Sequence, residues 1–218
     1  MTPPTHRPLS ARMTLPKNIL EAKLLHRQPA QLSRAVFLDR DGTLNLERGY
    51  ITDPREIELH PDTAQVLQGL SRMGFLVVVI SNQSAIGRNL MSVQQFEAVN
   101  DALWELLRQS GAHYDALYYC PHTPHVDPPC DCRKPKAGLV LQAALELNID
   151  LSSSYFIGDK LADMEAGRRA GCKTIWVLTG KETGNKRQGH DPVTPDCIQN
   201  TLTDAFAWIC VRENASEM

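Results

Sequence analysis

The chain has 218 residues, of which 42% are hydrophobic and 22% are charged, with 23 Lys and Arg against 25 Asp and Glu. This ordinary globular composition excludes an intrinsically disordered chain. The near-balanced charge argues against a dedicated nucleic-acid-binding protein. No apolar run approaches the ~18 residues that a membrane-spanning helix requires, so a membrane protein is also excluded. The length predicts one domain, or one domain with an extension.

The basic residues are concentrated near the N-terminus. Residues 1–38 carry a net charge of +5, which leaves −7 on the remaining 180 residues. This acid-poor segment is compatible with a transit peptide. Its prolines disfavour a continuous amphipathic helix, so we favour a locally ordered or floppy extension. We expect an extension over residues 1–33, a domain over residues 34–212 and a tail over residues 213–218.

Short apolar runs alternate with longer amphipathic stretches along the rest of the chain. In chain order, the pattern predicts a strand over 35–38, a helix over 62–73, a strand over 75–80, a helix over 92–109, a strand over 117–119, a helix over 137–147, a strand over 155–157, a helix over 161–170, a strand over 174–178 and a terminal helix over 202–211. Residues 180–200 are polar and contain Gly and Pro, which predicts a loop. The alternation predicts an α/β three-layer sandwich whose mostly parallel, doubly wound, Rossmann-like sheet is covered by helices on both faces.

Polar residues follow the predicted strands, where ligands bind in doubly wound folds. Asp39 and Asp41 follow the first strand, and Gly42 permits the turn that would bring both acids to one site. Asp159 follows the fourth strand, and Asp163 lies one helical turn further on. Converging carboxylates repel one another unless a cation joins them, and oxygen ligands suit Mg²⁺. The alternatives are an Asx turn in the first segment and a helix cap with a surface ion pair in the second.

A phosphate-binding set accompanies these acids. Ser81, Asn82 and Gln83 supply neutral groups after the second strand, and Arg133 and Lys134 supply positive charge. A phosphate held by a hydroxyl, backbone N–H groups and a lysine, opposite Mg²⁺, indicates phosphoryl transfer. The alternative for Lys134 is a solvated surface lysine.

Three cysteines and one histidine form the third group, namely Cys120, His122, Cys130 and Cys132. This ligand set is typical of a closed structural zinc site, with free buried thiols as the alternative. The group ends immediately before Arg133 and Lys134. We therefore expect zinc to fix the loop and to aim two phosphate-binding cations, a positional rather than a catalytic role.

Taken together, the motifs resemble the haloacid dehalogenase superfamily of phosphatases from about residue 34 to residue 180. Its four motifs are similar to the segments that contain Asp39 and Asp41, Ser81, Lys134, and Asp159 with Asp163. The resemblance implies that Asp39 attacks phosphorus and becomes an aspartyl phosphate, while Asp41 protonates the leaving alkoxide and then activates water. Ser81 and Lys134 would hold the phosphoryl oxygens. Asp39, the Asp41 carbonyl and Asp159 would bind Mg²⁺, and Asp163 would orient Lys160 or the metal's waters.

The zinc loop and the CDCRKP segment resemble a subgroup that contains heptose-bisphosphate and histidinol-phosphate phosphatases. In the heptose phosphatases the equivalents of these residues contact substrate: Glu47, Arg48, Gly49, Tyr50, Asn82, Gln83, Ser84, Arg133 and Lys160. The zinc spacer is closer to that of the histidinol phosphatases. Only 53 residues separate Ser81 from Lys134, which leaves no room for a large cap domain.

The expected function is Mg²⁺-dependent removal of the C7 phosphate from a heptose 1,7-bisphosphate, in lipopolysaccharide-core or S-layer precursor synthesis. The alternatives are a histidinol-phosphate phosphatase and a catalytically silent module that binds phosphorylated ligands. We expect a cytoplasmic monomer with a small phosphorylated sugar as its partner, and neither nucleic acid nor a membrane.

Overall fold

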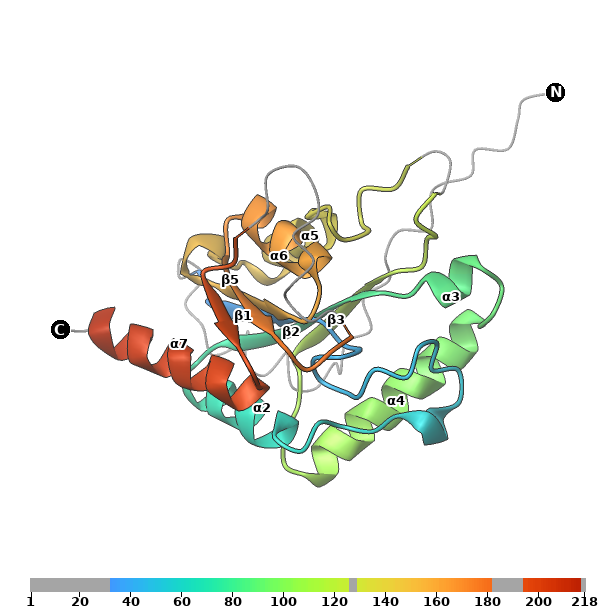
Figure 1. The fold of residues 1–218 in the computed structure, drawn as a ribbon, viewed down its shortest axis with the longest axis horizontal. Coiled ribbons are helices and arrows are strands. Elements are labelled where there is room, and N and C mark those ends of the chain that lie inside the picture. The colour runs from blue at the N-terminus through green and yellow to red at the C-terminus, as the bar shows by residue number, and fades with distance from the viewer. Residues whose placement is uncertain (1–31, 126–128, 182–193, 217–218) are drawn as a thin grey trace.

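The computed structural model describes residues 32–125, 129–181 and 194–216, which form a three-layer α/β sandwich (Figure 1). Its central sheet contains six strands in the order β3-β2-β1-β4-β5-β6, and every neighbouring pair is parallel. The strands are β1 (Ala35–Leu38), β2 (Leu76–Asn82), β3 (Ala116–Cys120), β4 (Tyr155–Gly158), β5 (Lys173–Val177) and β6 (Cys197–Gln199). The predicted parallel, doubly wound sheet is confirmed.

Helices cover both faces of this sheet (Figure 1). They are α2 (Thr63–Arg72), α3 (Ser84–Gly87), α4 (Val93–Gln109), α5 (Gly138–Leu147), α6 (Leu161–Ala170) and α7 (Leu202–Ser216), with short 3₁₀ helices η1 (Pro54–Glu56) and η2 (Leu151–Ser153). Helices α2, α4 and α7 pack on one face, and α5 and α6 pack on the other. The predicted start of α4 is confirmed, because Ser92 and Gln95 form a capping box there.

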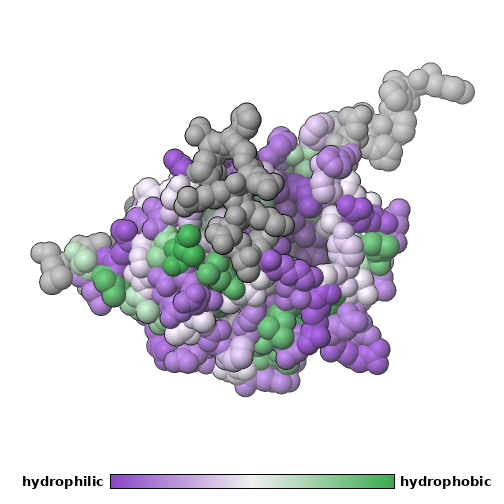
Figure 2. All heavy atoms as spheres, viewed as in Figure 1, coloured by the Kyte–Doolittle hydropathy of each residue, from purple (hydrophilic) through white to green (hydrophobic). Residues whose placement is uncertain are grey.

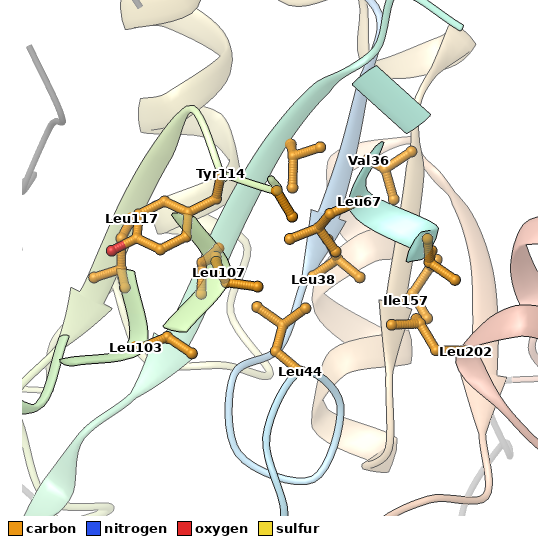
Figure 3. Close-up of a cluster of buried hydrophobic side chains, with 14 of the residues drawn as sticks. Val36, Leu38, Leu44, Leu67, Leu103, Leu107, Tyr114, Leu117, Ile157 and Leu202 are labelled. Carbon is orange, nitrogen blue, oxygen red and sulfur yellow. The ribbon is translucent and has the colours of Figure 1, made fainter. Parts of the chain in front are cut away.

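Side-chain alternation in the buried strands divides the core into two parts. Val36 and Leu38 of β1 face the core beneath α2, α4 and α7 (Figure 3), whereas Ala35 and Phe37 face the core beneath α5 and α6. All four side chains are fully buried. A strand buried on both faces therefore reads as an uninterrupted apolar run rather than as an alternating one.

One strand and one α-helix were not predicted, another helix is longer than predicted, and several other bounds differ by one or two residues. β6 lies inside the predicted loop over residues 180–200, of which residues 182–193 fall outside the described part of the chain. This three-residue edge strand has no apolar run, and it forms by pairing with β5. Helix α7 continues to Ser216, five residues further than predicted, and Glu213 in its last turns accepts a hydrogen bond from Tyr155 at 2.6 Å. Helix α3, directly after β2, was not predicted.

The strand order places a switch point between β1 and β4. The chain runs from β1 through β2 to β3 on one side and from β4 through β5 to β6 on the other. In such sheets ligands bind at the carboxyl ends of the strands near this point. The acidic motifs lie at these strand ends, so the predicted location is confirmed.

The surface carries no large apolar face in the view of Figure 2, where hydrophobic residues form small separate groups among hydrophilic ones. Within residues 32–125, 129–181 and 194–216, none of the helices combines the length and apolarity of a membrane span.

Candidate active site

A tight turn after β1 carries the first two acidic residues. Asp39 follows the strand, and its backbone N–H donates to Ile157 O of β4 at 3.0 Å. The chain then turns at Gly42, whose φ is +94°, a left-handed conformation that glycine adopts at little cost. The N–H groups of residues 43–45 all donate to Arg40 O and close the turn. The predicted role of Gly42 is confirmed.

Lys134 contacts the Asp39 carboxylate and is almost completely buried. Its Nζ lies 2.7 Å from Asp39 Oδ1 and 2.6 Å from Asp163 Oδ1, and it donates to Ile80 O at 2.7 Å. Burial opposes ionisation of Asp39, but the charges of Lys134 and Lys160 outweigh it and hold the Asp39 pKa below its ordinary value. Asp39 is therefore ionised at neutral pH and held in place. Lys134 is not the solvated surface lysine of the alternative reading.

Three buried carboxylates converge beside this pair, those of Asp39, Asp159 and Asp163. One oxygen from each lies within 4.8 Å of the others. Burial, and next the charge of Asp39, raises the Asp159 pKa to about 8. Burial also raises the Asp163 pKa to about 6. The predicted convergence is confirmed, and burial together with the like charge of Asp39 disfavours ionisation of Asp159 and Asp163.

The ammonium group of Lys160 lies among three oxygens. Its Nζ is 3.3 Å from Asp39 Oδ2, 2.8 Å from the backbone oxygen of Asp41 and 3.1 Å from Asp159 Oδ2. Apart from this ion pair, Asp159 Oδ2 has no hydrogen-bond partner in the described part of the chain. These three residues are the ones predicted to bind Mg²⁺. Two carboxylates and a carbonyl form an all-oxygen donor set that fits a hard divalent cation.

Two glycines leave space for the Asp159 carboxylate. A Cβ on Gly180 would lie 1.8 Å from Asp159 Oδ2, and a Cβ on Gly42 would lie 2.5 Å from the same atom. Thr179 joins the two glycine segments, because its hydroxyl donates to Gly42 O at 2.6 Å. The Thr43 hydroxyl donates to Asp159 Oδ1 at 3.2 Å. The sequence reasoning missed Thr179 and Gly180, although their place just after the strand β5 was a usable signal.

The Asp41 carboxylate has a separate set of partners. Gln83 Nε2 donates to Asp41 Oδ2 at 2.8 Å, and Asn45 Nδ2 donates to Asp41 Oδ1 at 3.0 Å. Gln83 Nε2 also donates to Ser81 Oγ at 2.8 Å. The guanidinium group of Arg40 pairs with the same carboxylate at 2.9 Å. Asp41 is therefore linked through Gln83 to the hydroxyl at the end of β2.

Asn82 holds the backbone at Lys134. Asn82 Nδ2 donates to Lys134 O at 3.0 Å, and Lys134 N donates to Asn82 Oδ1 at 3.1 Å. Both ends of this amide are thus used by the chain itself. Ser84 is buried at the start of α3. The substrate contacts expected of Asn82, Gln83 and Ser84 stay predictions, whereas the anchoring of Lys134 is a role that the sequence reasoning missed.

The side chains of the cysteine and histidine group converge, with residues 126–128 of the intervening loop outside the described chain. The Cys120–Cys132, Cys120–Cys130 and His122–Cys132 ligand atoms lie 3.2, 3.8 and 3.2 Å apart. Three sulfurs and one nitrogen at these separations can surround a single four-coordinate ion. Arg133 Nη1 donates to His122 O at 3.0 Å, so the predicted phosphate-binding arginine is attached to this group.

The loop over residues 47–50 lies beside Lys160. Glu47 Oε2 is 3.4 Å from Lys160 Nζ, and its other carboxylate oxygen accepts from Gly49 N at 2.7 Å. Arg48 pairs instead with Glu58, and Tyr50 is 51% exposed. Glu47 therefore adjoins the acidic cluster, whereas Arg48 and Tyr50 lie toward solvent.

Comparisons with known proteins agree with this geometry. The HAD-hydrolase-like family model matches residues 131–205. The D-glycero-beta-D-manno-heptose-1,7-bisphosphate 7-phosphatase of Haemophilus ducreyi is 40% identical over 185 residues, which cover 81% of this chain and 98% of that protein. The protein of the same name from Escherichia coli K12 is 37% identical, covering 78% and 90%.

Solved structures give the same result. The D,D-heptose 1,7-bisphosphate phosphatase of B. bronchiseptica, complexed with magnesium and phosphate, is 30% identical with a TM-score of 0.74, over 82% of this chain and 99% of that one. A HAD-like phosphatase from Mesorhizobium loti is 35% identical with a TM-score of 0.69, over 83% and 88%.

The parallel sheet and the strand-end carboxylates thus define a HAD-like phosphoric monoester hydrolase. Within that class, the identity and coverage show that the chain belongs to the family of heptose-1,7-bisphosphate 7-phosphatases.

Proposed function

We propose that this chain removes the C7 phosphate of D-glycero-D-manno-heptose 1,7-bisphosphate and leaves the anomeric phosphate in place. The observation that carries the proposal is the Asp39 carboxylate at the switch point, which is buried and contacted by the ammonium groups of Lys134 and Lys160. The relatives' names supply the substrate. The product would enter lipopolysaccharide-core or S-layer heptose synthesis.

Each of the site residues has a role in this reaction. Asp39 attacks phosphorus, which needs no prior deprotonation because its carboxylate is already ionised. Asp41 donates a proton to the leaving sugar oxygen and then takes one from the water that hydrolyses the aspartyl phosphate. Lys134 and the Ser81 hydroxyl hold the phosphoryl oxygens at the end of β2. Arg133 adds positive charge on the substrate side. Lys160 Nζ lies among the oxygens assigned to Mg²⁺, so its expected contact with substrate requires its side chain to turn away from them when the ion binds.

We infer that Asp39, the Asp41 carbonyl and Asp159 hold Mg²⁺, because a donor set made only of oxygens suits this hard cation. When bound, the ion would neutralise phosphoryl charge. Asp163 contacts Lys134 Nζ and accepts from the backbone N–H of Lys160 at 3.0 Å, so we assign it to aiming the two lysines.

A variant at Gly180 is expected to weaken metal binding without replacing a metal ligand. In Gly180→Ala the new Cβ must displace the Asp159 carboxylate, so we expect the Mg²⁺ concentration for half-maximal activity to rise at least about 10-fold. Magnesium titration of both proteins measures this. Gly74→Ala is the control, because its Cβ meets nothing within 4 Å but its φ of +81° should lower stability. An unchanged magnesium requirement in Gly180→Ala would contradict the assignment.

We also propose that Cys120, His122, Cys130 and Cys132 hold a structural Zn²⁺. None of the six cysteines forms a disulfide, which agrees with a reducing compartment such as the cytoplasm. The cluster directly precedes Arg133 and Lys134, so its role is to hold these two cations in place. A monomeric state and the absence of nucleic-acid or membrane partners stay predictions.

Loss of this zinc is expected to lower both stability and activity. In Cys130→Ser we expect zinc content to fall and the melting temperature to drop by at least about 5 °C, because a structural metal contributes to folding. We expect kcat/KM to fall about 10- to 100-fold, since the loop that presents Lys134 loosens. Metal analysis, thermal melting and phosphate release measure the three effects. Cys197→Ser, outside the cluster, is the control; equal behaviour of the two variants would argue against a zinc role.

Phosphate-release assays on heptose 1,7-bisphosphate and histidinol phosphate, both with Mg²⁺, test the substrate. We expect a higher kcat/KM on the heptose bisphosphate. A higher value on histidinol phosphate would assign the chain to the alternative reaction. No turnover of either compound, with ligand binding unchanged in Asp39→Asn, would indicate the silent binding module.

A further inference from the structure

Arg40, between the two acidic residues of the first motif, is unusually deeply buried. Its side chain is 1% exposed and is the largest by volume among the fully buried side chains of the described residues. Arginine is almost never buried in this way unless its charge is paired. The pairing is with Asp41: Arg40 Nε lies 3.1 and 3.2 Å from the two carboxylate oxygens, and Nη2 lies 3.0 and 2.9 Å from them. This two-pronged contact fixes the plane of the carboxylate as well as its place.

The far end of the guanidinium group is anchored on α4. Arg40 Nη1 donates to Asn100 Oδ1 at 3.1 Å, and the guanidinium carbon lies 5.6 Å from the ring centre of Phe96. Asn100 Nδ2 in turn donates to Phe96 O at 2.9 Å, which fixes the orientation of the amide. Asn100 is 3% exposed and lies on the apolar face of the helix. A polar residue at that position is costly unless its hydrogen bonds are made.

Asp41 is therefore held from three directions. Arg40 contacts both oxygens, Asn45 contacts Oδ1, and Gln83 contacts Oδ2 while also binding Ser81. Asn45 lies in the turn after β1, and Gln83 directly follows β2 and reaches the Ser81 hydroxyl at its end. Among these three partners, Arg40 is the one that connects Asp41 to the long helix α4.

We propose that Arg40, anchored by Asn100, is a positioning residue that aims the Asp41 carboxyl group at the leaving oxygen. The inference rests on the proposed function, in which Asp41 is the general acid. In that step an oxygen of Asp39 forms a bond to phosphorus, the bond between phosphorus and the C7 oxygen breaks, and its electron pair goes to the sugar oxygen. That oxygen takes the proton of Asp41. A displacement of about 1 Å in such a donor costs on the order of 10²-fold.

The leaving group reveals whether Arg40 acts through Asp41. A sugar alkoxide needs a proton as it departs, whereas nitrophenolate is a weak base that departs without one. Because kcat/KM covers only the steps through phosphoenzyme formation, the later activation of water does not enter. We therefore compare kcat/KM on heptose 1,7-bisphosphate with kcat/KM on p-nitrophenyl phosphate. In Arg40→Met we expect a loss of about 30-fold on the sugar phosphate and of less than about 3-fold on the aryl phosphate.

Additional variants keep the test decisive. Arg40→Lys retains the positive charge but not the contact of two nitrogens with the two carboxylate oxygens, so we expect an intermediate loss of kcat/KM on the sugar phosphate. Asn100→Ala removes only the anchor, and we expect about a 5-fold loss on that substrate alone. Should Arg40→Met fold poorly in thermal melting, these two milder variants supply the result. Arg108→Met, an exposed arginine on the same helix, is the control and should change neither value.

Asp41→Asn tests the general-acid role of Asp41 separately from the positioning role of Arg40. It should show the largest difference between the two substrates. If it does, and the Arg40 and Asn100 variants lower both substrates equally, Arg40 has a merely structural role and the inference is overturned while the proposed function stands. If Asp41→Asn itself lowers both substrates equally, the general-acid assignment fails and the inference falls with it. A loss confined to the sugar phosphate in the Arg40 and Asn100 variants supports the inference.

Discussion

Replacing Asp39 with asparagine is expected to lower kcat/KM for heptose 1,7-bisphosphate by at least about 10⁴-fold. The side chain keeps its size and its place beside Lys134, but the neutral amide is a poor nucleophile and cannot form the aspartyl phosphate. The loss should be equally large on p-nitrophenyl phosphate, because attack on phosphorus is required whatever the leaving group. Continuous phosphate release on both substrates measures it.

Two comparisons make this result specific to the nucleophile. Asp101→Asn, at an exposed position on α4, should retain full activity. Asp39→Ala should be as inactive as Asp39→Asn, which excludes slow conversion of the asparagine back to aspartate as a source of residual turnover. A rate above about 1% of the unaltered protein in both Asp39 variants would show that a different group attacks phosphorus.

The sequence predicts the location of this site better than the contacts within it. Asp39, Ser81 and Asp159 could be found because each follows an apolar run, and parallel strands bring their carboxyl ends to one edge of a sheet. The cysteine and histidine group could be found because ligand type and spacing are local properties. These predictions need only strand order and chain connectivity.

Side-chain directions depend on tertiary contacts that no local pattern contains. Asp163 was expected to orient Lys160 or the metal's waters, and helical spacing placed it on the correct face. Its carboxylate also contacts Lys134 Nζ, and Lys134 belongs to the loop before α5, earlier in the chain than β4. Both ends of the Asn82 amide bind the Lys134 backbone, a contact that the sequence does not indicate, while its expected contact with substrate stays a prediction.

The contacts of buried polar residues were the hardest feature to predict from the sequence. Arg40 would ordinarily be assigned to the surface, and its burial depends on Asn100, sixty residues later in the chain. Asn100 is a polar residue on the apolar face of α4, which the sequence pattern reveals. The pattern does not reveal that Asn100 binds Arg40. The short strand β6 was missed for the same reason, because its pairing with β5 rather than its composition makes it a strand.

Replacing Lys134 with methionine is expected to damage both catalysis and stability, and the two effects have separate causes. Loss of one charged donor to the phosphoryl group should lower kcat/KM about 10²- to 10³-fold. Lys134 is also buried between Asp39 and Asp163, so its removal leaves two buried carboxylates without their shared partner. Breaking a buried ion pair from one side costs about 3 to 5 kcal/mol of unfolding free energy. Urea unfolding and phosphate release measure the two losses.

A second substitution distinguishes the two causes. Adding Asp163→Asn to Lys134→Met removes one of the stranded charges, so the double variant should recover part of the lost stability. It should recover no activity, because the phosphoryl group still lacks its lysine. Lys136→Met is the matched control on the same loop, since its ion pair with Asp131 is exposed and contributes at most about 1 kcal/mol. If stability and activity instead recovered together in the double variant, Lys134 would be a structural counter-charge only, and its assigned contact with the phosphate would be wrong.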